Sequence, residues 1–285
     1  MTDSAHIVLP GCGTRFPYLI GAIKALELRG ISPLTFTGTS GGALISSLAA
    51  AGYDSERMTE LANKFLPKEV FSGGPLHMLF AGPMGGWFGG EKITKALKAT
   101  LPSNFDDFKK PLFIVTHNIS LGMPTIHCAA KYVPLIVPSP NYIIATDTPA
   151  YMAVRASMSI PLAFDAVKIK GHYHEDGGIS ANDFRDLLVP TTYSTIGFSF
   201  KASERRKTRQ MATHADRAGY VIDDMINASA REHIEDAHWS QTVLINDSHS
   251  GFDRSMSSKD VSDMVSVGYR DTLNFFRKKL AHSQR

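Results

Sequence analysis

The sequence is poor in cysteine, with only Cys12 and Cys128 among its 285 residues. Two cysteines cannot build a disulfide framework, and these two form no metal-ligand spacing, so we expect free thiols in a reducing compartment. The sequence also lacks any run of about 18 apolar residues, which argues against a membrane-spanning helix. It lacks an apolar signal-peptide core near the N-terminus as well. We therefore expect a cytoplasmic protein, and peripheral membrane contact or export without a standard signal peptide stay open.

A large excess of charge of either sign is absent too. The formal net charge is +3, and the content of 43% hydrophobic and 20% charged residues is ordinary for a globular protein. This balance neither demands nor excludes nucleic acid or an anionic membrane, and with no other indication we expect no nucleic-acid partner. No repeat, low-complexity tract or proline-rich linker divides the chain, so we expect a single domain over residues 1–285.

The most informative stretch that is present runs from Thr35 to Ile45. Its β-branched and aromatic residues suit a strand, its glycines suit a sharp turn, and the small apolar residues that follow suit a helix. The turn has the G-x-S-x-G arrangement, in which Gly38 and Gly42 leave room and the hydroxyl of Ser40 stands clear of a sheet. A helix N-terminus there favours negative charge. The pattern favours a nucleophilic serine, although ordinary turns contain similar sequences.

A glycine loop precedes this turn. Residues 6–9 suit a strand, residues 10–15 form the loop, and apolar residues at helical spacing continue to Leu28, which predicts a βαβ unit with a parallel sheet. The loop could bind a dinucleotide in an oxidoreductase, but Phe16 stands where the third glycine belongs. Alternatively, its N–H groups donate to a developing oxyanion beside Ser40. We favour the oxyanion interpretation.

A third pattern ends in Asp176-Gly177-Gly178. Residues 167–176 alternate like a short hairpin that delivers Asp176 at a strand end. Such a carboxylate is often a plain turn residue, yet Ser40 needs a group that activates it. The alternation puts His172 and His174 on the same face as Asp176, so either histidine is an alternative base. A metal site lacks a third ligand, and we expect no metal.

The rest of the chain alternates predicted helices and strands. The glycine-rich, apolar stretch over residues 64–90 is either a lid that meets lipid or a loop over the core. Basic residues at 205–209 indicate a solvated face or a contact with anionic headgroups. We expect further strands at residues 112–116, 126–129, 196–200 and 242–245, and helices at 91–101, 150–156 with Asp147 or Thr148 as its cap, 215–230 and 258–280.

Taken together and in this order, the motifs resemble those of the patatin-like phospholipase family, of the bacterial single-domain type. The resemblance covers nearly the whole chain, and it implies a three-layer α/β/α fold with a mainly parallel central sheet. Two departures stand in the glycine loop, where Cys12 replaces the middle glycine and Phe16 occupies a position that is often glycine. The matching stretches are Gly11-Cys12-Gly13-Thr14-Arg15, Gly38-Thr39-Ser40-Gly41-Gly42, residues 86–90, residues 153–161, Asp176-Gly177-Gly178 and residues 252–276. The last of them looks like the closing helix of the family.

The resemblance also implies a mechanism. Ser40 and Asp176 would form a catalytic dyad that cleaves the fatty-acyl esters of membrane phospholipids, as a phospholipase A does, beside an apolar tunnel and without a cofactor. Hydrolysis of lysolipids, acylglycerols or small esters stays open, as does a lipid-binding protein that Cys12 has weakened as a catalyst. The sequence identifies no protein partner or activator. The implied oxyanion donors are Gly11, Cys12 and Gly13, and Arg15, Gly177 and Gly178 are additional site residues.

Overall fold

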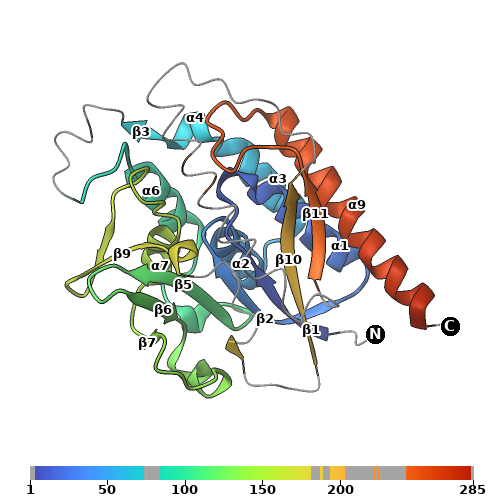
Figure 1. The fold of residues 1–285 in the computed structure, drawn as a ribbon, viewed down its shortest axis with the longest axis horizontal. Coiled ribbons are helices and arrows are strands. Elements are labelled where there is room, and N and C mark those ends of the chain that lie inside the picture. The colour runs from blue at the N-terminus through green and yellow to red at the C-terminus, as the bar shows by residue number, and fades with distance from the viewer. Residues whose placement is uncertain are drawn as a thin grey trace.

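The computed structural model describes residues 4–73, 77, 84–180, 187–188, 193–202, 221, 224 and 242–283. These residues form a nine-stranded sheet in the order β11-β10-β1-β2-β5-β6-β7, and the β8–β9 hairpin joins it beside β5 (Figure 1). The strands are β1 Ser4–Leu9, β2 Ser32–Thr39, β5 Leu112–Asn118, β6 Met123–His127, β7 Ile143–Ala145, β8 Val167–Ile169, β9 His172–Asp176, β10 Ser194–Ala202 and β11 Thr242–Asp247, with β3 Ser72–Gly73 and β4 Phe88–Gly89 in a separate pair.

The strand directions divide the sheet into two parts. Strands β11, β10, β1, β2 and β5 pair in parallel, as the predicted βαβ unit requires. Strands β6 and β9 both pair with β5 in the antiparallel direction, whereas β7 is parallel to β6. The sheet is therefore mixed and mainly parallel, and helices flank it, which confirms the α/β class that the sequence predicts.

The helices begin and end close to their predicted positions. The helix expected at residues 215–230 and the basic residues 205–209 lie outside the described residues, apart from 221 and 224. Most of the stretch at residues 74–83 lies outside them as well. The described α-helices are α1 Phe16–Leu28, α2 Gly41–Ala51, α3 Ser55–Lys64, α4 Pro67–Val70, α6 Glu91–Thr100, α7 Ala150–Ser157 and α9 Ser258–Ser283.

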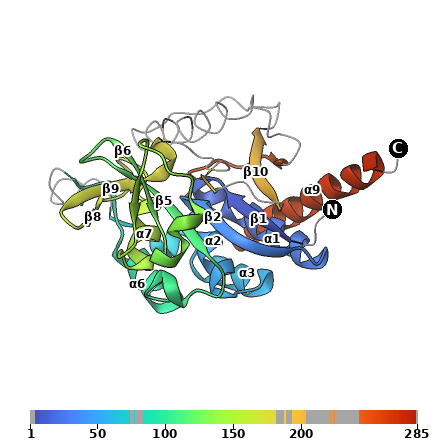
Figure 2. The same cartoon turned by 90° about the horizontal axis from the view of Figure 1, so that it is seen from below.

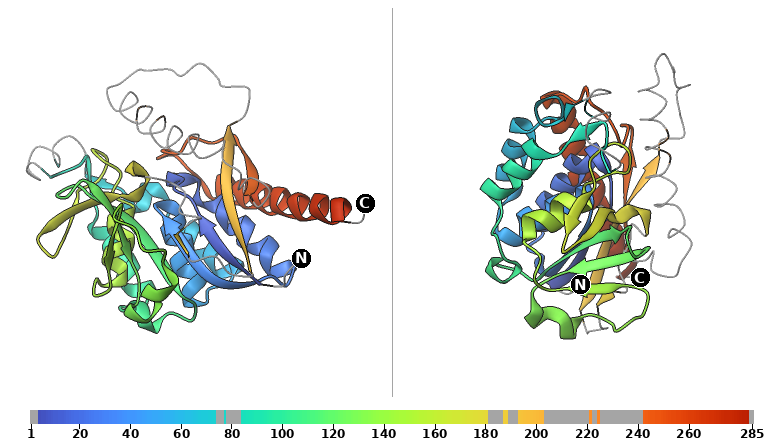
Figure 3. Two further views of the ribbon diagram at one scale, coloured as in Figure 1. Left: turned by 60° about the horizontal axis from the view of Figure 1, so that its bottom comes forward. Right: turned by 90° about the vertical axis from the view of Figure 1, so that its left-hand side faces the viewer.

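Helix α9 packs along α1, so the end of the described chain covers its beginning (Figures 1 and 2). Two glycines allow the close approach. A Cβ atom on Gly21 would collide with the backbone of Val265, and one on Gly268 would collide with the carbonyl of Tyr18. Close backbone contact of this kind favours glycine on both helices. Figure 3 shows the β8–β9 hairpin at the opposite end of the molecule from α9.

Two local predictions need correction. Neither Asp147 nor Thr148 caps α7. The N-cap residue is Pro149, and the helix has no side-chain hydrogen bond at this cap. The Thr148 hydroxyl lies 3.1 Å from Nδ1 of buried His127, and Asp147 forms an ion pair with Lys170. Residue 252, which we expected to begin the closing helical segment, lies in the loop before α9. The side chains of Asp147 and Thr148 therefore make tertiary contacts in place of a cap.

The predicted hairpin is confirmed. Strands β8 and β9 pair antiparallel, and only Lys170 and Gly171 connect them. Both residues have positive φ angles, of 49° and 88°. A two-residue turn with two positive φ angles matches the twist of its strands. The hairpin brings its last residue, Asp176, opposite Thr116 of β5.

In the described part of the chain, no helix combines the length and the apolar character that a membrane span requires.

Candidate active site

Ser40 lies at the sharp turn between β2 and α2. Its backbone has φ 53° and ψ −124°, a conformation that costs energy for a residue with a side chain. The neighbouring glycines make the turn possible, since a Cβ atom on Gly42 would collide with the carbonyl oxygens of Leu9 and Pro10. A Cβ atom on Gly38 would lie 2.6 Å from the carbonyl oxygen of Gly42. The two glycines named in the sequence pattern are thus steric requirements of this turn.

The hairpin brings Asp176 to this turn. The hydroxyl of Ser40 donates a hydrogen bond of 2.6 Å to Oδ2 of Asp176. The other carboxylate oxygen accepts from the N–H of Gly178 at 2.8 Å, and the Asp176 N–H donates to the carbonyl of Ser159. Ser40 is 4% and Asp176 6% exposed. The serine and the carboxylate therefore form a directly bonded, nearly dry pair.

The dryness of the site changes the acidity of the carboxyl group. Burial raises the pKa of Asp176 to about 7, although the hydrogen bonds from Ser40 and Gly178 act in the opposite direction. An ordinary aspartate is too weak a base to accept a serine proton readily. A carboxylate with a pKa near neutrality is better matched to proton transfer at physiological pH.

The glycines after Asp176 have separate tasks. A Cβ atom on Gly177 would lie 2.5 Å from the carbonyl oxygen of Val115, so only glycine fits between the hairpin and β5. Gly178 supplies the N–H that binds the carboxylate. Both residues therefore support Asp176.

Sequence reasoning missed Ser157 at the end of α7. Its hydroxyl accepts a hydrogen bond of 2.8 Å from the N–H of Ser40 and donates one of 2.6 Å to the carbonyl of Val115. The side chain is fully buried and ties the strained turn to strand β5. The surrounding stretch 153–161 belonged to the resemblance, but no spacing or composition distinguishes Ser157 from Ser159 within it.

The glycine loop, residues 11–15, lies on the other side of Ser40. Gly13 has a φ of 57° and lines the same cavity as Ser40. The carbonyl of Cys12 accepts hydrogen bonds from the N–H and from Nε of Arg15, at 3.1 and 3.2 Å. The guanidinium of Arg15 also forms a buried ion pair with Asp247. Arg15 thus connects the glycine loop to Asp247.

The structure accommodates both departures in this loop. Cys12 has a φ of −150°, which any residue can adopt, and its side chain is fully buried against Gly41. Burial raises the pKa of the Cys12 thiol to about 12, so the sulfur stays protonated and inert near neutral pH. Cys12 is therefore a packing residue. Phe16, the other departure, lines the cavity.

An apolar cavity of about 120 Å³ opens beside Ser40, where the sequence predicted a tunnel. Helices α2, α3 and α6 supply about half of its lining residues, and aromatic residues from other segments join them. Such a cavity, with a few polar groups at one end, is typical of a site for an apolar ligand. Its apolar lining includes Leu44, Leu48, Met58, Leu61, Phe65, Phe71, Ile93, Leu97, Phe164 and Phe252.

The histidines of the hairpin do not contact Ser40. Nδ1 of His174 lies 2.9 Å from the hydroxyl of Thr116, which lies 2.9 Å from Nε2 of His127. Burial lowers the pKa of His174 to about 4 and that of His127 to about 3, so both rings are neutral. His172, the other alternative base, lies at the turn end of β9 and pairs with Ile169. The group that bonds to Ser40 is Asp176.

Within the described ranges, no group of three or more histidine, cysteine, aspartate or glutamate side chains is arranged to hold a metal ion.

Comparisons with known proteins identify the family of the chain. The patatin-like phospholipase family matches residues 7–189, and the chain belongs to that family. It is 25% identical over 197 residues to a probable lipid hydrolase, 463L, of Invertebrate iridescent virus 6, a match that spans 64% of this chain and 62% of that protein. The chain thus covers less than two thirds of that relative.

Two further comparisons extend over nearly the whole chain. An uncharacterized protein of Bacillus subtilis, YqhO, is 23% identical over 299 residues, which span 95% of this chain and 97% of that protein. The crystal structure of VipD from Legionella pneumophila superposes with a TM-score of 0.59 at 15% identity, over 97% of this chain and 67% of that one. At this identity the structural likeness establishes the fold alone.

Proposed function

We propose that the chain is a lipid acyl hydrolase of the phospholipase A type that uses Ser40 as nucleophile and Asp176 as its base. The observation that carries the proposal is the 2.6 Å hydrogen bond between these side chains at the end of an apolar cavity. Membership of the patatin-like phospholipase family and the similarity to a probable lipid hydrolase support the substrate class. The apolar cavity has the character that a fatty-acyl chain requires.

In the proposed reaction, Ser40 Oγ attacks the ester carbonyl while its proton passes to Asp176. The tetrahedral intermediate carries a negative oxygen, which the N–H groups of Gly11, Cys12 and Gly13 would stabilise together with the N-terminus of α2. Asp176 then returns the proton to the leaving alcohol, and an acyl-enzyme remains on Ser40. Water, deprotonated by Asp176, attacks this ester, and Asp176 returns the proton to Ser40 Oγ as the fatty acid leaves.

The size of the cavity favours a second candidate substrate class. A volume of about 120 Å³ is close to the roughly 150 Å³ cavity that holds one benzene molecule. Small esters and acylglycerols with short chains would fit it without any rearrangement. A catalytically weak lipid-binding protein is the remaining alternative, but the inert, well-packed Cys12 gives no support to it.

A substrate panel tests these proposals. The wild type and the Ser40→Ala variant would be incubated with phospholipid vesicles, lysolipids, acylglycerols and short p-nitrophenyl esters, and released acid would be measured. We expect release from phospholipid by the wild type alone. Release only from the short esters would favour the second candidate, and equal release by both proteins would contradict the role of Ser40.

We also propose that residues 1–285 form one domain, since a single sheet takes strands from both ends of the described chain. Contact with a lipid surface is a further part of the proposal. Leu162 is 68% exposed, and its carbonyl accepts a hydrogen bond from Trp87, close to the cavity residue Phe164. An exposed apolar side chain beside a cavity wall suits a peripheral encounter with lipid.

A further inference from the structure

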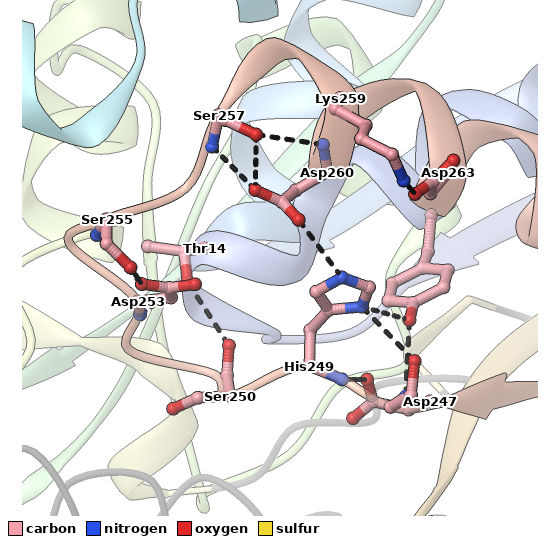
Figure 4. A network of polar contacts seen from close by, with 12 residues as sticks. Thr14, Asp247, His249, Ser250, Asp253, Ser255, Ser257, Lys259, Asp260 and Asp263 are labelled. Carbon is pink, nitrogen blue, oxygen red and sulfur yellow. Dashed lines mark hydrogen bonds and ion pairs between the residues drawn. The ribbon is translucent and has the colours of Figure 1, made fainter.

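The glycine loop is attached to a segment more than 230 residues away in the sequence. This segment, residues 248–257, connects β11 to α9 and is called the β11–α9 loop below. The N–H of Thr14 donates to the carbonyl of Gly251 at 2.8 Å. The Thr14 hydroxyl donates to the carbonyl of Ser250 at 3.3 Å and accepts from the N–H of Asp253 at 2.9 Å (Figure 4). One buried threonine thus forms three hydrogen bonds with the loop.

A second attachment runs through Arg15 and Asp247, the last residue of β11. Their ion pair is almost fully buried, with side chains 3% and 4% exposed. Arg15 also holds the carbonyl of Cys12. In a trans peptide the carbonyl of one residue and the N–H of the next point in opposite directions. A fixed Cys12 carbonyl therefore fixes the direction of the Gly13 N–H, one of the proposed oxyanion donors.

The same loop reaches the acyl cavity. Phe252 lines it together with Gly13 and Thr14, and its ring stacks on that of Phe71 with centroids 5.9 Å apart and planes 19° apart. The hydrogen bonds between Thr14 and residues Ser250, Gly251 and Asp253 surround this position. The wall of the cavity and the support of the oxyanion loop are therefore adjacent parts of one segment.

The β11–α9 loop is itself held in a defined conformation. Asp247 accepts a hydrogen bond from the N–H of His249, whose Nδ1 lies 2.8 Å from the hydroxyl of Tyr18 on α1. Near its end, the carboxylate of Asp260 binds both the N–H and the hydroxyl of Ser257 (Figure 4). A loop supported in this way can hold a neighbouring loop in place.

We propose that residues 247–253, from the end of β11 into the β11–α9 loop, are a part of the active site that positions the oxyanion donors, with Thr14 and Arg15 as positioning residues. This inference rests on the proposed hydrolase function and extends it beyond residues 7–189, the part that the family matches. It assigns to residues 247–253 a role in transition-state stabilisation without contact with the reacting atoms. An oxyanion donor contributes to catalysis only when it is held where the charge develops.

The test compares Thr14→Val, which removes the hydroxyl and keeps the shape, with Thr14→Ser, which restores the hydroxyl. Ser255→Ala is the matched control, because it removes a hydrogen bond to Asp253 within the loop and leaves Thr14 untouched. We expect Thr14→Val to lower kcat for a short ester about 10- to 100-fold with little change in KM, since small displacements of catalytic groups cost this much. Thr14→Ser should recover most of the loss, and Ser255→Ala should match the wild type.

Hydrogen–deuterium exchange of the same proteins provides a readout that does not depend on turnover. Thr14→Val should speed exchange in residues 9–18 and in residues 248–256 together. An unchanged kcat, a loss that Thr14→Ser does not recover, or faster exchange in neither segment overturns the proposal. If the wild type hydrolyses no ester, the proposed function fails, and the exchange result alone then decides whether the loop holds residues 11–15.

Discussion

The serine turn and the glycine loop line the same cavity, and they are held in place differently. The turn at residues 38–42 is shaped by its own glycines, which pack against the backbone of Leu9 and Pro10, and the hydroxyl of Ser157 of α7 accepts a hydrogen bond from the backbone of the turn. The glycine loop at residues 11–15 depends on Asp247 and on residues 250–253. The shape of the serine turn is therefore set by its own glycines, whereas the position of the proposed oxyanion donors depends on a remote segment.

The largest effect is expected from a change within the serine turn. Gly42→Ala would place a methyl group against two backbone carbonyls that cannot move aside, so the turn should open. We expect activity to fall below detection and the free energy of unfolding to fall by about 1–3 kcal/mol, as for overpacked sites. Ester hydrolysis and urea unfolding would measure the two effects.

Gly122→Ala is the control for this change. Gly122 has a positive φ of 69°, but a Cβ atom there would contact nothing within 4 Å. The Gly122→Ala variant should therefore lose about 1 kcal/mol of its free energy of unfolding through backbone strain and keep full activity. Equal effects of the two substitutions would show that the close packing of the turn does not explain the need for Gly42.

The next largest effect is expected at Asp176. Asp176→Asn keeps the shape of the side chain but removes the base, so kcat should fall about 10²- to 10⁴-fold. Burial disfavours the charged carboxylate, so the folded state binds its proton more tightly than the unfolded state. Stability from this group is thus lost as pH rises from about 4 to about 7. Asp176→Asn should therefore unfold at a higher temperature than the wild type at pH 8, and a lower one would contradict this account of the dry site.

A smaller effect is expected from pH on the wild type itself. Asp176 must be ionised to accept the Ser40 proton, and its pKa is raised to about 7 by burial. The value of kcat/KM should thus rise about tenfold per pH unit below 7 and level off above it. Initial rates on a soluble ester between pH 5 and 9 would give the profile. A plateau that extends down to pH 5 would mean that another group acts as the base.

The smallest effect is expected from the buried side chains of Thr116, His127 and His174, where the Thr116 hydroxyl lies within hydrogen-bonding distance of both histidine rings. The pKa of His174 is lowered in the folded state, so the unfolded state takes up the proton first as pH falls below about 6.5. Because of His174, the wild type should lose about 1–2 kcal/mol of its free energy of unfolding between pH 8 and pH 5, and His174→Gln should not show this part of the loss. Urea unfolding at both pH values would show it, and parallel losses in the two proteins would exclude this role.

The difference between the serine turn and the glycine loop also determines what could be predicted from the sequence. The serine turn and the aspartate hairpin depend on neighbouring residues, and their glycines stand in the sequence beside Ser40 and Asp176. The support of Ser40 by Ser157 and the support of Thr14 by residues 250–253 join segments that are distant in the sequence. No periodicity or spacing records such a contact. Phe252, expected at the start of a helical segment, proved to be a cavity residue for the same reason.

The most direct test of the central account is to react the protein with a fluorophosphonate and to locate the adduct by mass spectrometry of its peptides. The pairing of Ser40 with Asp176 predicts a single modified residue, Ser40, in the wild type. It predicts much slower labelling in Asp176→Asn and none in Ser40→Ala. An adduct on another residue, or labelling of Asp176→Asn as fast as that of the wild type, would contradict the dyad.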